Sequence, residues 1–234
     1  MRTKASAHDV KKARGSGPRD PERTSASILA AAVKEFTEKG YAGARIDAIA
    51  ERSGANKRMI YHYFGDKEGL YLAVLESAYV GIRSAEAELR LTDLEPEQAV
   101  ERLVAFTWDY FIAHPEFLSI LSTENLHRAK FLKKLKRVLE LHSPLVSMIS
   151  DVLKRGSGQG AFRADADPVH VYISIASLGI FYLSNRWTLS AIFSRDLTTK
   201  EELAAWGRHI AAVILGYLAA ASRLKAPLDG DGHL

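Results

Sequence analysis

The chain has 234 residues, 47% hydrophobic and 26% charged, with a formal net charge of +4, as is ordinary for a folded globular protein. It contains no cysteine, which excludes disulfide bonds and thiolate chemistry. No apolar run reaches the ~18–20 residues that span a bilayer. The basic N-terminus is not followed by the apolar stretch of a secretory signal, so we expect a cytoplasmic protein without a membrane partner.

The first 23 residues are predicted to be a disordered basic arm. They carry seven Lys or Arg and three Asp or Glu, a charge of +4, with little apolar surface to bury. Residues 24–65 add six bases and four acids. Positive charge gathered in this part of the chain suits attraction to nucleic-acid phosphates, and a passive solubilising tail would explain the arm equally well.

Three short helices are expected next. The first runs from Thr24 or Ser25 to Lys39, and Gly40 is a natural helix stop. The second covers about 45–53. Gly54 then provides a turn that needs a positive φ, and Asn56 caps a third helix that ends at Phe64. Asp66 is placed to cap a fourth helix from residue 67.

The third helix combines basic, amide and aromatic side chains on one exposed face. The major groove of DNA admits a helix of this size and presents acceptors to Lys and Arg. Ile60 and Phe64 are expected to face the core, whereas Lys57, Arg58, Met59, Tyr61 and His62 are left towards solvent or DNA.

The remaining sequence predicts helices at 67–90, 97–113, 116–125, 129–154, 168–193 and 200–223, hence an all-α fold of about nine helices. Pro144 should kink or divide its segment, and Gly156, Gly158 and Gly160 mark a flexible turn. We therefore expect a basic arm over 1–23, a helix-turn-helix domain over 24–70, a helical regulatory and dimerisation domain over 71–225, and a disordered tail over 226–234.

Residues 24–75 resemble the DNA-binding domain of the TetR family of bacterial transcriptional regulators. The resemblance rests on Phe36, Gly40, Ile49-Ala50, Gly54, the run Ile60-Tyr61-His62-Tyr63-Phe64 and the run Asp66-Lys67-Glu68-Gly69-Leu70. It implies a three-helix reader of double-stranded DNA and a larger helical domain that forms a homodimer. It also implies an unidentified small-molecule effector that binds inside this domain and lowers operator affinity.

The resemblance assigns roles to the reader. Tyr61 and Lys67 match phosphate contacts, and Lys57 and Arg58 lie in the helical turn that meets base edges, where phosphate contact alone is nearly as plausible. Arg45 replaces a common Thr, and Met59 a small polar residue, so base preference cannot be transferred there. The predicted DNA-binding set is Arg45, Asn56, Lys57, Arg58, Met59, Tyr61, His62 and Lys67.

Apolar and polar side chains in the larger domain are candidates for an effector pocket, since such sites are mostly apolar with a few polar anchors. The candidates are Trp108, Phe111, Phe117, Asn125, His142, Tyr172, Phe181 and Asn185. Ordinary core packing would account for most of them. The polar run Glu124 to Arg128 is either a ligand entrance or, more simply, a solvated helix end.

The last helix carries a predicted dimer face. Ala212, Gly216 and Ala220 recur every four residues and would permit close helix approach, with packing inside one chain as the alternative. The predicted interface comprises Trp206, His209, Val213, Gly216 and Tyr217.

No sequence signature of an enzyme is present, neither His-Glu-x-x-His nor a phosphate-binding glycine loop nor a nucleophile elbow, and we expect no cofactor or metal. The sequence thus indicates a ligand-responsive regulator, most plausibly a repressor, that binds a palindromic operator as a dimer. The alternative is a sequence-tolerant nucleoid-type DNA-binding protein without an effector.

Overall fold

The computed structural model describes residues 20–140 and 142–219, and within them every regular element is helical, as the sequence predicts. The α-helices are α1 Pro21–Gly43, α2 Ile46–Ser53, α3 Lys57–Phe64, α4 Lys67–Ala87, α5 Pro96–Ala113, α6 Pro115–Leu126, α7 Lys136–Glu140, α8 His142–Gly158, α9 Pro168–Phe193 and α10 Lys200–Ala219. Two short 3-10 helices, η1 Leu91–Asp93 and η2 Leu132–Lys134, complete the described part.

Helix α1 begins earlier than the sequence suggested. The Asp20 side chain accepts a hydrogen bond from the backbone N–H of Glu22, and Pro21 occupies the first helical position, where its missing N–H costs nothing. Residues 21–23 therefore belong to α1 and not to a disordered arm. The rest of the predicted arm, and the tail over 226–234, lie outside the described residues.

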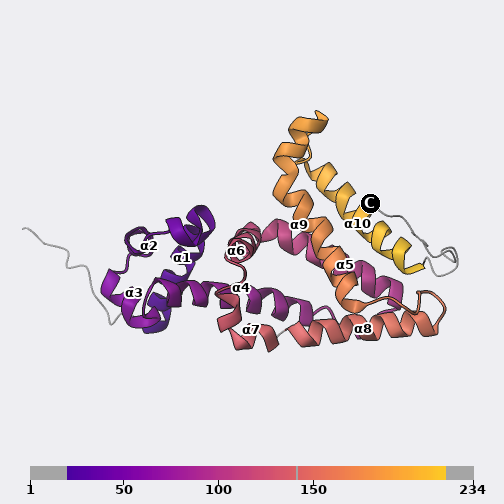
Figure 1. The fold of residues 1–234 in the computed structure, drawn as a ribbon, viewed down its shortest axis with the longest axis horizontal. Coiled ribbons are helices and arrows are strands. Elements are labelled where there is room, and N and C mark those ends of the chain that lie inside the picture. The colour runs from indigo at the N-terminus through magenta and orange to yellow at the C-terminus, as the bar shows by residue number, and fades with distance from the viewer. Residues whose placement is uncertain (1–19, 141, 220–234) are drawn as a thin grey trace, which may run out of the picture.

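The predicted stops and caps of the N-terminal helices are confirmed. Gly40 interrupts the helical geometry of α1 with φ 63°, although one further turn follows it, and Gly54 has φ 68°. The Asn56 side chain accepts from the N–H of Met59, and the Asp66 side chain accepts from the N–H of Gly69. These glycines and caps place α2 and α3 against α1 in a compact three-helix unit (Figure 1).

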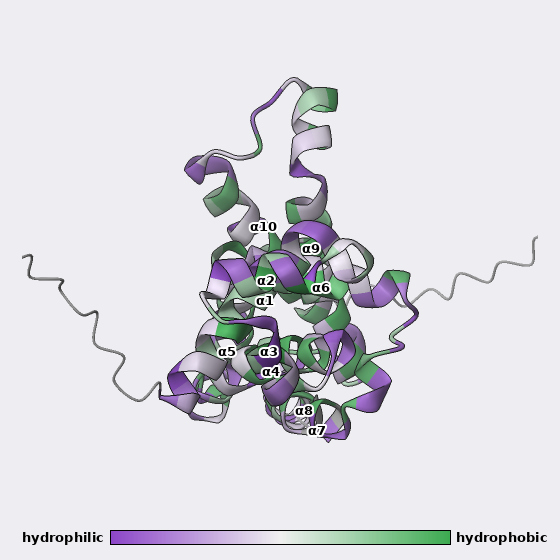
Figure 2. Ribbon diagram, turned by 90° about the vertical axis from the view of Figure 1, so that its left-hand side faces the viewer, coloured by the Kyte–Doolittle hydropathy of each residue, from purple (hydrophilic) through white to green (hydrophobic). Residues whose placement is uncertain are grey.

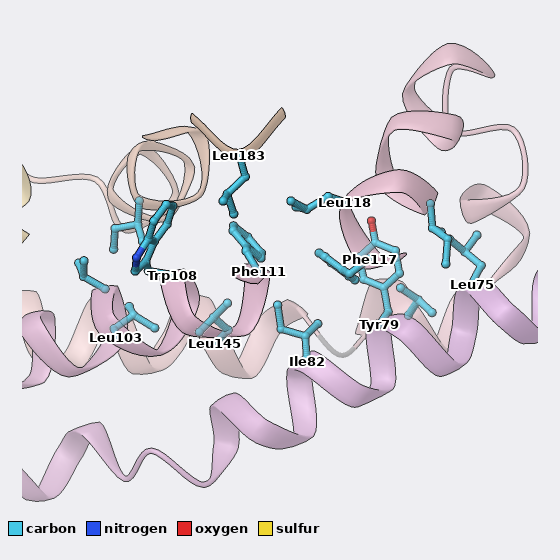
Figure 3. Close-up of a cluster of buried hydrophobic side chains, with 14 of the residues drawn as sticks. Leu75, Tyr79, Ile82, Leu103, Trp108, Phe111, Phe117, Leu118, Leu145 and Leu183 are labelled. Atoms are coloured by element: carbon cyan, nitrogen blue, oxygen red, sulfur yellow. The ribbon is translucent and has the colours of Figure 1, made fainter. Parts of the chain in front are cut away.

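Helix α4 leads from this unit into a body built from α5 to α10 (Figure 1). Buried apolar side chains from α4, α5, α6, α8 and α9 meet in one core (Figure 3). The C-terminal part of α9 and the start of α10 form a hairpin that projects beyond this core, with apolar residues at its tip (Figure 2).

The segment 129–154 is not one helix, because η2 and Leu135 precede α7. Between α7 and α8 lies residue 141, which is outside the described residues, so the predicted division at Pro144 stays a prediction. The predicted flexible glycine turn is wrong at its start, because α8 continues through Gly158. Packing explains why residue 156 is a glycine. A Cβ at this position would lie 2.1 Å from the ring of Phe162, which is buried.

Replacing Gly156 with alanine should therefore destabilise the body. Overpacking of a filled core costs about 1–3 kcal/mol, so we expect a loss of that size in the free energy of unfolding by urea. Gly158→Ala is the matched control, since nothing lies within 4 Å of a Cβ at that helical position. Equal stability of the two variants would contradict the close approach of Phe162.

Candidate nucleic-acid interface and effector region

The exposed face of α3 is the candidate nucleic-acid interface. Ile60, fully buried, anchors the helix against α1 and α4, which leaves the opposite face free. The predicted DNA-binding residues on that face are exposed, and they are Asn56, Lys57, Arg58, Tyr61 and His62. A cation, an amide, a hydroxyl and an imidazole thus lie on one short helix.

Met59 departs from the prediction. It is half-buried and packs against the core beside Ile60, so it contributes packing as much as surface. Two exposed residues are also partly engaged within the chain. The Asn56 side-chain oxygen is used to cap α3, and the Lys57 ammonium forms an ion pair with Asp47 of α2. Arg58 forms no ion pair among the described residues, so its guanidinium is the most available cation of the face.

The two flanking basic residues differ in accessibility. Arg45 is exposed at the N-cap of α2. The Lys67 ammonium donates to the Ala42 carbonyl at 3.3 Å and lies 5.1 Å from the centre of the Tyr41 ring. Burial lowers the pKa of Lys67. Lys67 thus holds the end of α1 against α4 in addition to any phosphate contact.

A network of carboxylates stabilises the DNA-binding unit, and the sequence analysis did not predict it. Glu35, nearly buried on α1, accepts from the backbone N–H of Arg45 at 3.1 Å. Arg52 of α2 is bound by both oxygens of Glu38 at 3.0 Å and lies 3.8 Å from Glu35. This hydrogen bond to Arg52 lowers the pKa of Glu38. The network fixes the start of α2, a long-range contact that no local pattern indicates.

The predicted pocket residues do not gather in one place. Phe111 of α5 and Phe117 of α6 are buried and stacked on each other with ring centres 6.0 Å apart, and they form core (Figure 3). Asn125 and Asn185 each donate to a carbonyl one turn earlier in their own helices. The side chain of His142 lies outside the described residues.

Two open grooves flank α10. One, of about 770 Å³, runs between α5 and α10 and is lined by Trp108, whose indole N–H donates to the carbonyl of Leu203. The other, of about 800 Å³, lies between α9 and α10 and is lined by Phe181, Phe193 and Trp206. Trp108 and Phe181 therefore belong to different grooves, while Tyr172 lies elsewhere, bonded to Arg83 of α4.

The polar run Glu124 to Arg128 is a solvated helix end only in part. Glu124 is 2% exposed, and its carboxylate accepts from the backbone N–H of Leu132. His127 lies edge-on to Tyr41 of α1, with ring centres 6.1 Å apart. Through Glu124 and His127 the run connects the end of α6 with the segment after it and with α1, whereas Asn125 and Arg128 are exposed.

The predicted dimer residues divide into two kinds. Trp206 is half-buried, stacks on Tyr182 at 4.8 Å and donates to the carbonyl of Leu178, so it packs within the chain. The others are exposed on the outer side of α10, namely His209, Val213, Gly216 and Tyr217. Large apolar side chains on α9 are exposed as well, including Ile173, Phe181, Trp187, Ile192 and Phe193.

Among the described residues, no cluster of three or more His, Asp or Glu side chains is arranged to hold a metal ion. In the same part of the chain, no helix is long and apolar enough to cross a membrane.

Removal of the Glu35 carboxylate should loosen the reader. Glu35→Ala leaves the N–H of Arg45 without its acceptor, and because this hydrogen bond is partly buried we expect a drop of about 0.5–1.5 kcal/mol in the free energy of unfolding. Glu51→Ala, at an exposed carboxylate of α2 outside this network, is the control and should stay within about 0.5 kcal/mol. Chemical denaturation measures both, and similar losses would argue against a special role for Glu35.

Comparison with known proteins gives the same picture for both parts of the chain. Residues 28–74 match the family model for bacterial regulatory proteins of the tetR family, and residues 96–214 match the tetracyclin repressor-like C-terminal domain. The HTH-type transcriptional repressor NicS of Pseudomonas putida KT2440 is 45% identical over 185 residues, covering 79% of this chain and 87% of NicS. The repressor SCO4008 of Streptomyces coelicolor is 41% identical over 108 residues, 46% of this chain and 53% of that protein.

Solved structures share the fold. A tetR-family regulatory protein from Rhodococcus RHA1 superposes with a TM-score of 0.67 at 16% identity, covering 84% of this chain and 97% of that one. FadR from Bacillus subtilis, solved in complex with stearoyl-CoA, superposes with a TM-score of 0.62 at 15% identity, covering 82% and 98%. With both domain models matched and a relative at 45% identity, the chain belongs to the TetR family of bacterial transcriptional regulators.

Proposed function

We propose that this protein is a ligand-responsive repressor that binds a palindromic operator as a homodimer and is released by a small molecule. The observation that carries the proposal is the α3 face, where Lys57, Arg58, Tyr61 and His62 are exposed while Ile60 is fully buried. The names of two relatives, both transcriptional repressors, support the direction of regulation.

The contacts of the reader are proposed to divide into positioning and specifying ones. The Tyr61 hydroxyl and the Lys67 ammonium bind backbone phosphates, which orient a protein on DNA without reading its sequence. Arg58 and Lys57, in the first turn of α3, reach base edges. Arg58 forms no ion pair among the described residues, so it is free to donate to guanine O6 and N7 with two parallel N–H groups.

The dimer is proposed to form on the outer faces of α9 and α10. Phe181, Val213 and Tyr217 are exposed there, and so are Trp187 and Phe193 of α9. Several large exposed apolar side chains on neighbouring helices are typical of an interaction site. A two-fold axis along these helices would set two readers about one DNA turn, ~34–36 Å, apart.

Substitutions in α3 test the division of roles. Arg58→Ala should weaken operator binding and lower the ratio of operator to random-DNA affinity, since one bidentate base contact discriminates by about 1–3 kcal/mol. Tyr61→Phe should weaken both affinities alike, because only a phosphate contact is lost. Fluorescence anisotropy at fixed salt measures the affinities of the wild type and both variants for operator and for random DNA. A wild-type protein with little preference for operator over random DNA would instead indicate a nucleoid-type protein.

A charge placed on the outer face of α10 should separate the dimer. Val213→Asp buries an unpaired carboxylate in the proposed interface, so sedimentation velocity at micromolar concentration should show a monomer and operator affinity should fall steeply. Leu126→Asp is the control, because Leu126 is 83% exposed at the end of α6, away from α9 and α10, and should remain dimeric. A monomeric wild type would refute the proposed assembly.

A further inference from the structure

The regulatory domain holds a buried ion pair on α4. Arg83 and Glu86 lie one turn apart with side chains 4% and 1% exposed, and Arg83 Nη1 donates to Glu86 Oε2 at 2.5 Å. A buried pair of charges loses its hydration, and a well-packed apolar pair of similar volume is often as stable or more so. Stability alone therefore does not account for these two residues in the interior.

The pair is also incompletely satisfied. Arg83 Nε and Glu86 Oε1 are both buried and have no hydrogen-bond partner within the described part of the chain. Almost all buried polar groups in folded proteins are paired with protein or ordered water, so two unpaired atoms in one ion pair require an explanation such as a bound water or ligand. One unused donor and one unused acceptor thus stand next to each other in the core.

Three tyrosines from three helices surround the pair. The Tyr172 hydroxyl of α9 accepts from Arg83 Nη2 at 2.8 Å, and the guanidinium lies 5.4 Å from the centre of that ring. Tyr79 lies one helical turn before Arg83. Tyr110 of α5 faces α4 at Gly81, where its hydroxyl would be 3.2 Å from an added Cβ. Tyr110 and Tyr172 are half-buried, whereas Tyr79 is 5% exposed.

We propose that Arg83 and Glu86, with Tyr79, Tyr110 and Tyr172, form the polar anchor of the effector site, and that the effector is a small organic carboxylate with a flat apolar body. This inference rests on the proposed ligand-responsive function. A guanidinium is the side chain best matched to a carboxylate, and Arg83 Nε is the donor left for it. The three phenol rings provide the apolar walls for the body of the ligand.

Glu86 makes the anchor receptive to an anion. Burial raises the pKa of Glu86 to about 7, although the nearby Arg83 charge opposes the rise. A protonated Glu86 leaves the charge of Arg83 uncompensated and turns the carboxyl into a donor for the ligand. The other titratable groups facing the pair are Tyr79, Tyr110 and Tyr172, while Arg155 of α8 is bound to the carbonyls of Leu91 and Leu94.

The test uses sodium benzoate as probe and benzamide as its neutral counterpart, with the full-length dimer. Benzoate should raise the thermal unfolding midpoint by at least about 2 °C at saturation and release operator DNA, whereas benzamide should do neither. Equal responses to the two compounds, or no response to benzoate, would overturn the proposal.

Variants separate the anchor from the fold. Arg83→Met combined with Glu86→Leu removes both charges without leaving one unpaired, so it should fold and bind operator while its benzoate affinity falls about tenfold or more. Arg137→Gln with Glu76→Gln removes an exposed ion pair that also involves α4 and should keep the wild-type response. A benzoate affinity of the Arg83→Met and Glu86→Leu variant close to that of the wild type would exclude the anchor.

The pH dependence gives a readout that a structural role would not produce. Benzoate stays ionised, so its affinity should follow protonated Glu86 and fall roughly tenfold between pH 6 and pH 8. Glu86→Gln should abolish this dependence, and a retained slope would reject the role of Glu86. Failure of the wild type to bind operator at any pH would instead refute the proposed function, since carboxylate binding is measured separately from DNA binding.

Discussion

An aromatic cluster at the junction of reader and body is the contact on which the arrangement of the molecule depends. Tyr71 of α4 is fully buried, with the rings of Phe36, Tyr41 and Phe131 each centred 5.0 Å away. Each pair of such rings adds about 0.5–1.5 kcal/mol beyond its buried area. Because two of these residues come from α1, one from α4 and one from the segment after α6, the cluster fixes the DNA-binding helices relative to the regulatory domain.

The helices of the DNA-binding unit could be predicted from the sequence because short-range interactions define their ends. The caps at Asn56 and Asp66 and the turn at Gly54 act over three or four residues, and a linear pattern therefore reveals them. Start points were less certain, as at α1, where Asp20 and Pro21 extend the helix beyond its apolar stripe. The all-α fold followed because an apolar repeat of 3.6 residues persists through almost the whole described body.

Contacts between distant residues were beyond the reach of such patterns. Glu35 and Arg45 are ten residues apart, and Arg83 and Tyr172 are 89 apart, so no periodicity connects them. Aromatic residues in the body showed the same limit. Phe111 and Phe181 look alike in sequence, but Phe111 is 2% exposed in the core and Phe181 is 59% exposed. Sequence identifies which residues are apolar, whereas packing decides which of them remain accessible.

Helix α4 makes long-range contacts at both of its ends. Its first turn holds Lys67 against the end of α1, and its last turns hold Arg83 and Glu86 in the interior of the body. An effector bound at the proposed site of Arg83 and Glu86 would therefore contact the same helix that Tyr71 packs against Phe36 of α1.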